Sequence, residues 1–259
     1  MAHFRPARLA VGFCTLIGVL ALWYVSTSAT GWIEPTRFPN PVDVWDALQQ
    51  ITVTGYANGR LDQHILHSVA LVVMGFLAAT VIGVPLGLWM GYSARAEAFF
   101  NPIFMLIRPI PPLAWIPLAI VWLGLEDASK VMVIWFAAFV PSVINSYVGV
   151  RSIEQPVLEA ASMLEVRGAR FVREVVVPGA LPHVFTGLRL SLQASWTTLV
   201  AAELIGAFFG LGHVLTQSSL DIYPAMILVA MMTVAVCGGL MTLVLTWLEH
   251  ASMPWRRKS

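Results

Sequence analysis

The sequence predicts an all-α, polytopic membrane protein with about six transmembrane helices. Of its 259 residues, 58% are hydrophobic and only 11% are charged, whereas soluble domains are about 45–50% apolar and about 25% charged. Apolar runs of the roughly 20 residues needed to cross a bilayer recur along the chain. The longest polar interruption of the C-terminal two-thirds, residues 159–182, lies between two of them. With so few charged residues, a soluble domain of this length could not cover its surface with groups that water solvates. We therefore treat residues 1–259 as one transmembrane domain.

The first span is expected from about Leu9 to Ser26, after the basic residues Arg5 and Arg8. A basic start, an apolar middle and the small residues at 26–30 are also typical of a secretory signal peptide. The run is long for a signal peptide and the rest of the chain is membrane-embedded, so we expect the span to be retained. Cleavage would leave the later spans unchanged.

A short amphipathic helix and a second span follow. Residues 42–51 place their apolar side chains near one face, which favours a helix in the membrane interface; a plain connecting loop is the alternative. The second span is expected from about His64 to Met90. Its glycines Gly75, Gly83 and Gly87 share one helical face, and small residues there allow another helix to approach closely.

Proline breaks the third apolar run, residues 100–125. Five prolines fall within 16 residues, and a regular helix cannot pass through residues 109–112 because proline lacks an amide hydrogen and clashes with the preceding turn. Irregular backbone at membrane depth is tolerated only where protein or a water-filled cavity surrounds it. We expect the third span at about Leu113 to Leu125, entered through an interfacial kink beside Arg108.

The remaining spans are expected at about 131–150, 181–205 and 224–248. A short polar turn at 126–130 precedes the first of these. A loop or short re-entrant element at 208–223 precedes the last and contains Gly210-Leu-Gly212.

No metal or disulfide site is expected. Cys14 and Cys237 lie far apart in apolar runs with no paired spacing, so we interpret them as small hydrophobic residues. His64 and His67 are three residues apart, but no third ligand is nearby in the sequence.

Basic residues fall mainly on one side of the predicted topology. If the N-terminus is cytoplasmic, the cytoplasmic segments hold Arg5, Arg8, Arg95, Arg151, Arg167, Arg170, Arg173, Arg256, Arg257 and Lys258. The opposite side holds Arg37, Arg60 and Lys130. The positive-inside rule therefore predicts that both termini and the loop at about 151–182 are cytoplasmic.

The predicted cytoplasmic loop carries a spaced motif. It reads Glu159-Ala160-Ala161, then three intervening residues and Glu165, then nine intervening residues and Val175, Val177 and Pro178. This resembles the pattern E-A-A, three residues, G, nine residues, I-x-L-P of the transmembrane subunits of bacterial ABC importers, with Glu165 at the glycine position. The resemblance implies that Glu159, Ala160, Ala161, Glu165, Gly168 and Pro178 belong to the loop that couples to the ATPase. In that family the motif glycine lies at the turn between two short helices. Gly168 is an alternative residue for this turn.

Further motifs are similar to the nitrate, sulfonate and taurine subfamily across roughly residues 60–250. They are RPIPPLAW at 108–115, WLG at 122–124, SK at 129–130, PGALP at 178–182 and TGLR at 186–189. WTTLVAAEL at 196–204, followed by GLG at 210–212, looks most like taurine permeases. The resemblance implies a type I ABC importer permease fold in the bacterial inner membrane. It also implies a homodimer that works with two ABC ATPase subunits and an extracytoplasmic substrate-binding protein.

The chain carries no site for ATP of its own. A phosphate-binding loop has the form G-x-x-x-x-G-K-[ST], and neither lysine, Lys130 or Lys258, follows a glycine. We therefore assign ATP and Mg²⁺ to the partner ATPase and expect a transport subunit that is not an enzyme. Membrane lipid surrounds it, and no cofactor, metal or nucleic-acid partner is expected.

The substrate pathway is expected to use polar residues within the spans. A charge at membrane depth costs about 2.5–3.5 kcal/mol on insertion scales and usually marks function, which selects Arg108, Arg189 and Glu203. Each has a structural alternative: an interfacial place for Arg108, an acid or loop carbonyls for Arg189, and an interhelical partner for Glu203. Ser195, Trp196, Thr197 and Thr198 offer donors to a sulfonate, although mid-span hydroxyls also bond to their own helix.

Sequence reasoning thus favours a permease for taurine or a related sulfonate, with three alternatives. A nitrate, other small organic anion or aromatic acid importer of the same family is the nearest. An ion-coupled secondary transporter would favour intramembrane acids and inverted repeats, but Glu203 is the only acid at depth and no internal repeat is visible. The third alternative is an integral membrane enzyme, but the sequence shows no nucleophile-base or metal-ligand spacing that would support it.

Overall fold

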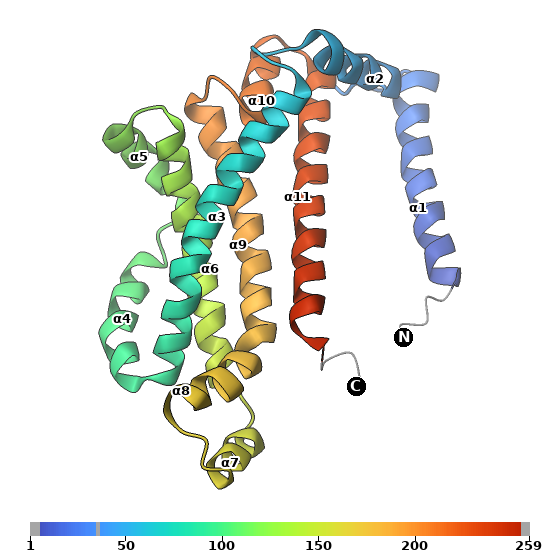
Figure 1. Ribbon diagram of the computed structural model, residues 1–259. Coiled ribbons are helices and arrows are strands. Elements are labelled where there is room, and N and C mark those ends of the chain that lie inside the picture. Colours follow the sequence, from blue (N-terminus) through green and yellow to red (C-terminus); the bar gives the residue numbers. More distant parts are fainter. Residues whose placement is uncertain (1–5, 35–36, 255–259) are drawn as a thin grey trace.

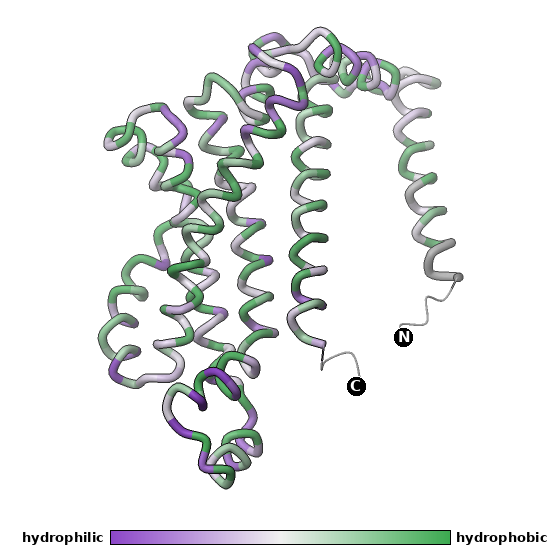
Figure 2. Tube along the Cα trace, viewed as in Figure 1, coloured by the Kyte–Doolittle hydropathy of each residue, from purple (hydrophilic) through white to green (hydrophobic). Residues whose placement is uncertain are grey.

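The computed structural model describes residues 6–34 and 37–254, and no β-strand occurs among them. Five of the described helices are long and apolar enough to cross a membrane, and a sixth crossing exists if the bent pair α4 and α5 counts as one span. The prediction of an all-α membrane protein with about six spans is confirmed. Figure 2 shows apolar residues along the long helices and more polar residues in the connections at both ends of the molecule.

The N-terminal part consists of α1 (Pro6–Tyr24), extended by a π-helical turn (Val25–Ala29), and α2 (Pro41–Gln49) with a second π-helical turn (Gln50–Thr54). The Asn40 side chain accepts the Asp43 amide at 2.8 Å, which caps the start of α2. Val44 and Ala47 are buried while Trp45 is exposed. The predicted amphipathic helix is therefore confirmed.

Three long helices form the centre: α3 (Leu61–Tyr92), α6 (Asp127–Arg151) and α9 (Val177–Gly206). Helix α6 packs between α3 and α9 (Figure 1). The predicted glycine face of α3 lies against α6, where a Cβ atom on Gly83 would approach Ser142 Cβ to 3.0 Å. The same Ser142 also contacts α9, because its hydroxyl lies 2.8 Å from that of Ser191. Small residues thus bring these backbones close together.

The third predicted span needs correction. Helix α4 (Ala94–Ile107) is followed by a 3₁₀ turn of 4 residues (Pro112–Trp115) and by α5 of 8 residues (Ile116–Leu123), bent from α4 by 81°. The break at 109–112 is confirmed, but residues 113–125 are too short to cross a hydrocarbon core of about 30 Å. Helix α4 begins before the apolar run at 100–125, because Ser93 Oγ accepts the Ala96 amide at 3.4 Å and caps the helix start.

The other long helix is α11 (Pro224–Ser252). The spans predicted at 131–150, 181–205 and 224–248 correspond to α6, α9 and α11. The polar turn predicted at 126–130 is wrong, because Asp127 already begins α6 and Ser129 Oγ closes its first turn on the Glu126 carbonyl at 2.7 Å.

Short helices occupy the two ends of the bundle. Helices α7 (Gln155–Met163) and α8 (Gly168–Phe171) lie at one end, followed by a π-helical turn (Val172–Val176) that runs into α9. Helix α10 (Leu211–Leu220) lies at the opposite end, near α2 (Figure 1). The start of α1 and the end of α11 lie at the same end as α7. Arg5, Arg256, Arg257 and Lys258, used in the charge count, are outside the described residues, as is the Arg8 side chain.

Candidate functional site

The predicted loop forms a helix-turn-helix in which Glu165 makes the turn. Helix α7 ends in a Schellman motif: the Val166 amide donates to the Ala161 carbonyl at 3.0 Å, and the Glu165 amide donates to the Ser162 carbonyl at 3.1 Å. This geometry gives Glu165 a left-handed φ of 54°, at a cost of about 1–2 kcal/mol for a residue with a Cβ atom. Gly168 has a φ of 60°, but it starts α8 and does not replace Glu165 in the turn.

The outer surface of α7 combines polar and large apolar side chains. Glu159 and Ala160 are exposed, whereas Ala161 is buried. Met163 and Leu164 at the tip are 83% and 76% exposed. Pro178 is half-buried in the first turn of α9. Exposed apolar side chains that adjoin on a projecting loop are typical of a protein interaction site.

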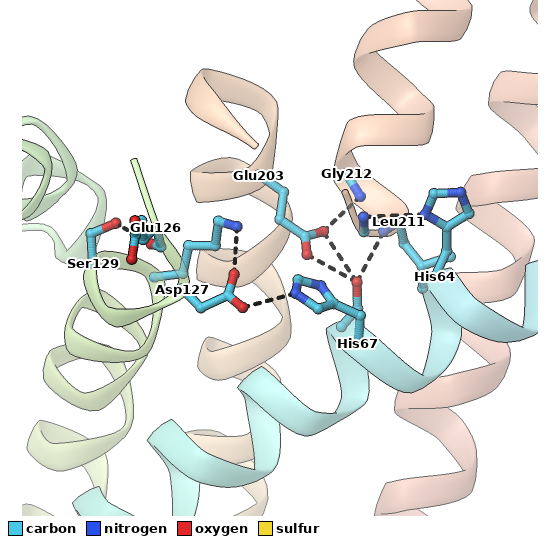
Figure 3. A network of polar contacts seen from close by, with 11 residues as sticks. His64, His67, Glu126, Asp127, Ser129, Glu203, Leu211 and Gly212 are labelled. Atoms are coloured by element: carbon cyan, nitrogen blue, oxygen red, sulfur yellow. Dashed lines mark hydrogen bonds and ion pairs between the residues drawn. The ribbon is translucent and has the colours of Figure 1, made fainter. Parts of the chain in front are cut away.

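At the opposite end, Glu203 on α9 is held by two donors. Its side chain is buried with only 1% exposure. The Ser68 hydroxyl of α3 donates to the carboxylate at 3.0 Å, and the Gly212 amide of α10 donates at 2.7 Å (Figure 3). Glu203 therefore joins α3, α9 and α10 at one point.

Three successive amides at the start of α10 are each bound by a different side chain. His64 Nδ1 accepts the Gly210 amide at 3.2 Å, Ser68 Oγ accepts the Leu211 amide at 2.9 Å, and Glu203 accepts the Gly212 amide (Figure 3). Since Nδ1 of His64 is an acceptor, its ring proton lies on Nε2, which donates to the Tyr56 carbonyl at 3.0 Å. Three of the four amides that a helix start leaves unpaired are thus bound by side chains.

The Gly210-Leu-Gly212 motif allows this close approach. Gly210 has a φ of 117°, and a Cβ atom there would collide with the Glu203 carboxylate. A Cβ atom on Gly212 would lie 2.9 Å from the Val200 carbonyl oxygen. Both glycines are required because α10 begins directly against α9 and the Glu203 side chain.

Further polar contacts surround the Glu203 site. Asp127 on α6 accepts from Lys130 at 2.9 Å and from His67 Nε2 on α3 at 3.0 Å (Figure 3). The far end of α10 is tied down by the Tyr56 hydroxyl, which donates to Asp221. Burial and this hydrogen bond raise the pKa of Tyr56 above its ordinary value. His64 and His67 thus have separate partners, and among the described residues no group of three His, Cys, Asp or Glu is arranged for a metal.

The other predicted pathway residues lie apart from this site. Arg189 pairs with Glu249 of α11. Ser195 donates to the Ser191 carbonyl of its own helix at 2.8 Å. Trp196 and Thr198 are buried, and the Trp196 indole nitrogen has no hydrogen-bond partner among the described residues. Arg108, at the end of α4, lines a cavity to which the other predicted pathway residues do not contribute.

Sequence reasoning missed Ser68, His64 and Asp127 as members of the polar network. The paired glycines at 210 and 212 were the available signal, because such spacing indicates close backbone approach. Nothing in the sequence indicated which side chains would meet them.

The chain is similar along most of its length to proteins of one kind. The sequence profile of the family described as binding-protein-dependent transport system inner membrane component matches residues 83–258. The taurine transport system permease protein of Escherichia coli strain K12 is 34% identical over 252 residues, which cover 97% of this chain and 90% of that protein. A putative aliphatic sulfonates transport permease protein of Bacillus subtilis is 30% identical, covering 92% and 84%. The nitrate import permease protein of Synechocystis is 30% identical, covering 98% and 92%.

Proposed function

The chain belongs to the family of binding-protein-dependent transport system inner membrane components and is a permease subunit of the nitrate, sulfonate and taurine ABC importers; we propose that it carries taurine or a related sulfonate. It is a transport subunit and not an enzyme. Family membership therefore argues against both alternative functions, the ion-coupled secondary transporter and the integral membrane enzyme. The family implies a partner ATPase and a substrate-binding protein. Similarity to the taurine permease over nearly the whole chain supports the substrate class.

Helix α7 is the proposed contact with the ATPase, and its surface is the observation that carries this part of the proposal. Met163 and Leu164 are exposed at the tip of the loop, next to the exposed Glu159 and Ala160. Burying two such side chains in a partner would remove them from water, which is worth about 1.5–3 kcal/mol for each. The ATPase, which binds ATP and Mg²⁺, would then pull on α7 as it closes.

Movement at α7 has a direct route to the far end of the protein. Helix α8 and the π-helical turn Val172–Val176 run into α9 without a loop. Helix α9 then runs for 30 residues to the Glu203 site, where it is bonded to α3 and α10. We propose that ATP binding at one end and delivery of substrate at the other are linked through this continuous helix.

A homodimer is proposed because one chain of about six spans supplies only about half of the helices needed to line a pathway, and its exposed apolar surface leaves room for a second chain. The side chains of α1 that face outward are exposed, among them Val11, Phe13, Val19 and Leu22. Trp23, near the C-terminal end of α1, does pack against the core. In Figure 1, α1 stands to one side of the bundle. A second permease chain would cover part of this surface and complete a pathway that one chain lines only in half.

The α7 end is the proposed cytoplasmic side of the inner membrane. Five arginines lie at this end, in the first turn of α4, at the end of α6 or between α7 and α9: Arg95, Arg151, Arg167, Arg170 and Arg173. The positive-inside rule places such residues in the cytoplasm. The Glu203 end would then face the substrate-binding protein.

Reconstitution with the partner proteins tests the proposal. The permease is co-expressed with the ATPase and binding protein encoded beside it, and ATP hydrolysis is measured in lipid with and without taurine-loaded binding protein. Stimulation by taurine supports the permease and its substrate together. Stimulation by nitrate but not by any sulfonate would overturn the substrate, and failure to bind any ATPase would overturn the coupling role of α7.

A bulky substitution tests the loop directly. Ala160→Trp on the exposed face of α7 should leave folding intact and uncouple ATP hydrolysis from uptake. Val157→Trp, on an exposed position of the same helix before the motif, is the matched control. Unchanged stimulated hydrolysis and uptake in Ala160→Trp would contradict the proposal.

A further inference from the structure

The break between α4 and α5 places irregular backbone at membrane depth. Helix α4 ends at Ile107, and α5 leaves at 81° to it. In Figure 1 the connection between them lies beside the middle of α3 and α6, far from either end of the bundle. Backbone of this kind is tolerated inside a bilayer only where protein or a water-filled cavity surrounds it. Broken helices of this kind form substrate sites in other transporters.

Arg108 stands at this break, and its side chain has no hydrogen-bond or ion-pair partner among the residues that the structure describes. It caps the C-terminal end of α4 and is exposed. Within residues 6–34 and 37–254 it takes part in none of the ion pairs. An arginine at this depth is strongly disfavoured against lipid. We therefore expect the Arg108 side chain to lie against water or another protein chain.

A cavity of about 270 Å³ opens beside Arg108, between α3, α4 and α6. Its polar side chains are Asn101, Arg108 and Tyr147, and its apolar wall includes Phe104 and Val143. A water molecule takes about 30 Å³ of liquid volume, so the cavity has room for a small organic molecule. The polar part of that molecule would contact the polar side chains of the cavity, and its apolar part would contact the apolar wall.

The charge around the cavity favours an anion. Tyr147 of the cavity wall contacts a carboxylate, because its hydroxyl donates to Glu97 Oε1 at 2.5 Å. Arg151 lies 3.5 Å from the other oxygen of Glu97 and neutralises it. Arg108 is thus left as the unpaired charge of the cavity wall, with five N–H donors suited to an oxyanion.

By contrast, the outward side chains of α11 are apolar over most of the helix. Val236, Leu240, Leu243 and Val244 are all exposed. On α4, Phe99, Ile103, Met105 and Leu106 are exposed as well. The two helices therefore differ in Arg108, the charged residue at the break after α4.

We propose that the cavity beside Arg108 is an anion site on the substrate passage, in which Arg108 binds the acid group of the sulfonate-class substrate and Asn101 supplies a second donor. This rests on the proposed function for the substrate class. Beyond the proposed function, the inference states which side of the chain lines the passage and which residue binds the anion.

Thiol labelling tests the site without removing Arg108. In a Cys14→Ser, Cys237→Ala background, Asn101→Cys is treated in lipid nanodiscs with two reagents of equal chain length, sulfonatoethyl and trimethylammonioethyl methanethiosulfonate. The Asn101→Cys thiolate displaces methanesulfinate and forms a disulfide with the reagent. We expect the sulfonate reagent to react roughly tenfold faster because opposite charges attract at this range, and we expect taurine to slow it.

Adding Arg108→Gln should abolish the preference, whereas Arg95→Gln on the same helix should preserve it. Val236→Cys on α11 should resist both reagents. A thiol at 101 that reacts with neither reagent, or a preference that persists in Arg108→Gln, would overturn the site.

Transport measurements separate this inference from the proposed function. In the complete transporter, Arg108→Gln should lower taurine uptake by roughly tenfold or more, the usual effect of losing a hydrogen bond to a charged group. Stimulation of ATP hydrolysis by loaded binding protein should persist, and Arg108→Lys should restore part of the uptake. If Arg108→Gln transports normally while hydrolysis remains coupled, the anion site is wrong and the permease function stands. If no ATPase couples to the chain, the proposed function fails, and the labelling still decides the site.

Discussion

Helices α7 and α10 are similar in length and lie at opposite ends of the molecule, yet they are held in different ways. Both end in a Schellman motif with a left-handed residue that is not glycine, Glu165 at φ 54° and Ile222 at φ 52°. Helix α10 also has its first amides bound by His64, Ser68 and Glu203 from other helices. Helix α7 has no side-chain cap, and large apolar side chains at its tip are exposed.

This difference shows how each helix is held in place. The start of α10 is fixed by its own chain, because each of its bonds reaches a residue of α3 or α9. Helix α7 receives little of this support, which agrees with the proposal that the ATPase covers its tip. Under the same proposal, the α10 end would present a preformed surface to the binding protein, and the α7 end would move with the ATPase.

Removing Glu203 should have the largest effect on this comparison. Glu203→Ala leaves the Ser68 hydroxyl and the Gly212 amide without their acceptor, at about 1–3 kcal/mol for each buried group. We expect a loss of roughly 3 kcal/mol or more in the free energy of unfolding, measured by denaturation in detergent. Glu203→Gln keeps one acceptor oxygen and should lose less. Equal stability of Glu203→Ala and the parent would contradict the proposed anchoring of α10.

A Cβ atom on Gly210 should come next in size. Gly210→Ala adds about 1–2 kcal/mol of left-handed strain and a collision with Glu203. Gly239→Ala is the matched control, because that glycine lies in α11 with open space around its Cβ direction. Thermal unfolding should fall for Gly210→Ala and stay level or rise for Gly239→Ala. A similar shift in both variants would show that the close approach to Glu203 is unimportant.

Glycine at the two left-handed positions should raise stability modestly. Each substitution relieves about 1–2 kcal/mol of strain but adds about 0.5–1 kcal/mol of chain entropy. We expect Glu165→Gly to gain roughly 0.5–1 kcal/mol and Ile222→Gly to gain somewhat more, since a β-branched residue tolerates this conformation worst. Chemical denaturation measures both gains. A loss of stability in either variant would mean that its side chain makes a stabilising contact.

The exposed tip of α7 should have the smallest effect on stability. Met163→Ser combined with Leu164→Ser removes no buried contact, so the free energy of unfolding should change by less than about 0.5 kcal/mol. Co-purification with the ATPase should nevertheless be lost. Leu220→Ser, an equally exposed leucine at the α10 end, should retain the ATPase. Retention of the ATPase by the double variant would place the docking surface elsewhere.

The sequence predicts those features that depend on local chemistry. Proline at 109–112 breaks a helix wherever it stands, and the glycine spacing on α3 fixes a shared face. The turn after α7 was expected from the motif, but the residue that makes it was left open between Glu165 and Gly168. The Glu203–Ser68 bond joins residues far apart in the chain, and a serine within an apolar helix does not indicate its partner. The start of α4 was missed because the third span was expected only from about Leu113, although Ser93 is a suitable N-cap residue.

The glycine contact between α3 and α6 limits where the protein can bend. Almost no side-chain atoms separate the two backbones at Gly83 and Gly87, so neither helix can slide or tilt against the other without a collision. Hydroxyl bonds join α9 to the same unit through Ser142 and Ser191. We therefore expect the three helices to move as one unit during transport. The hinges of the transport cycle then belong at its borders: the kink after Arg108, the connection of α7 and the outlying α1.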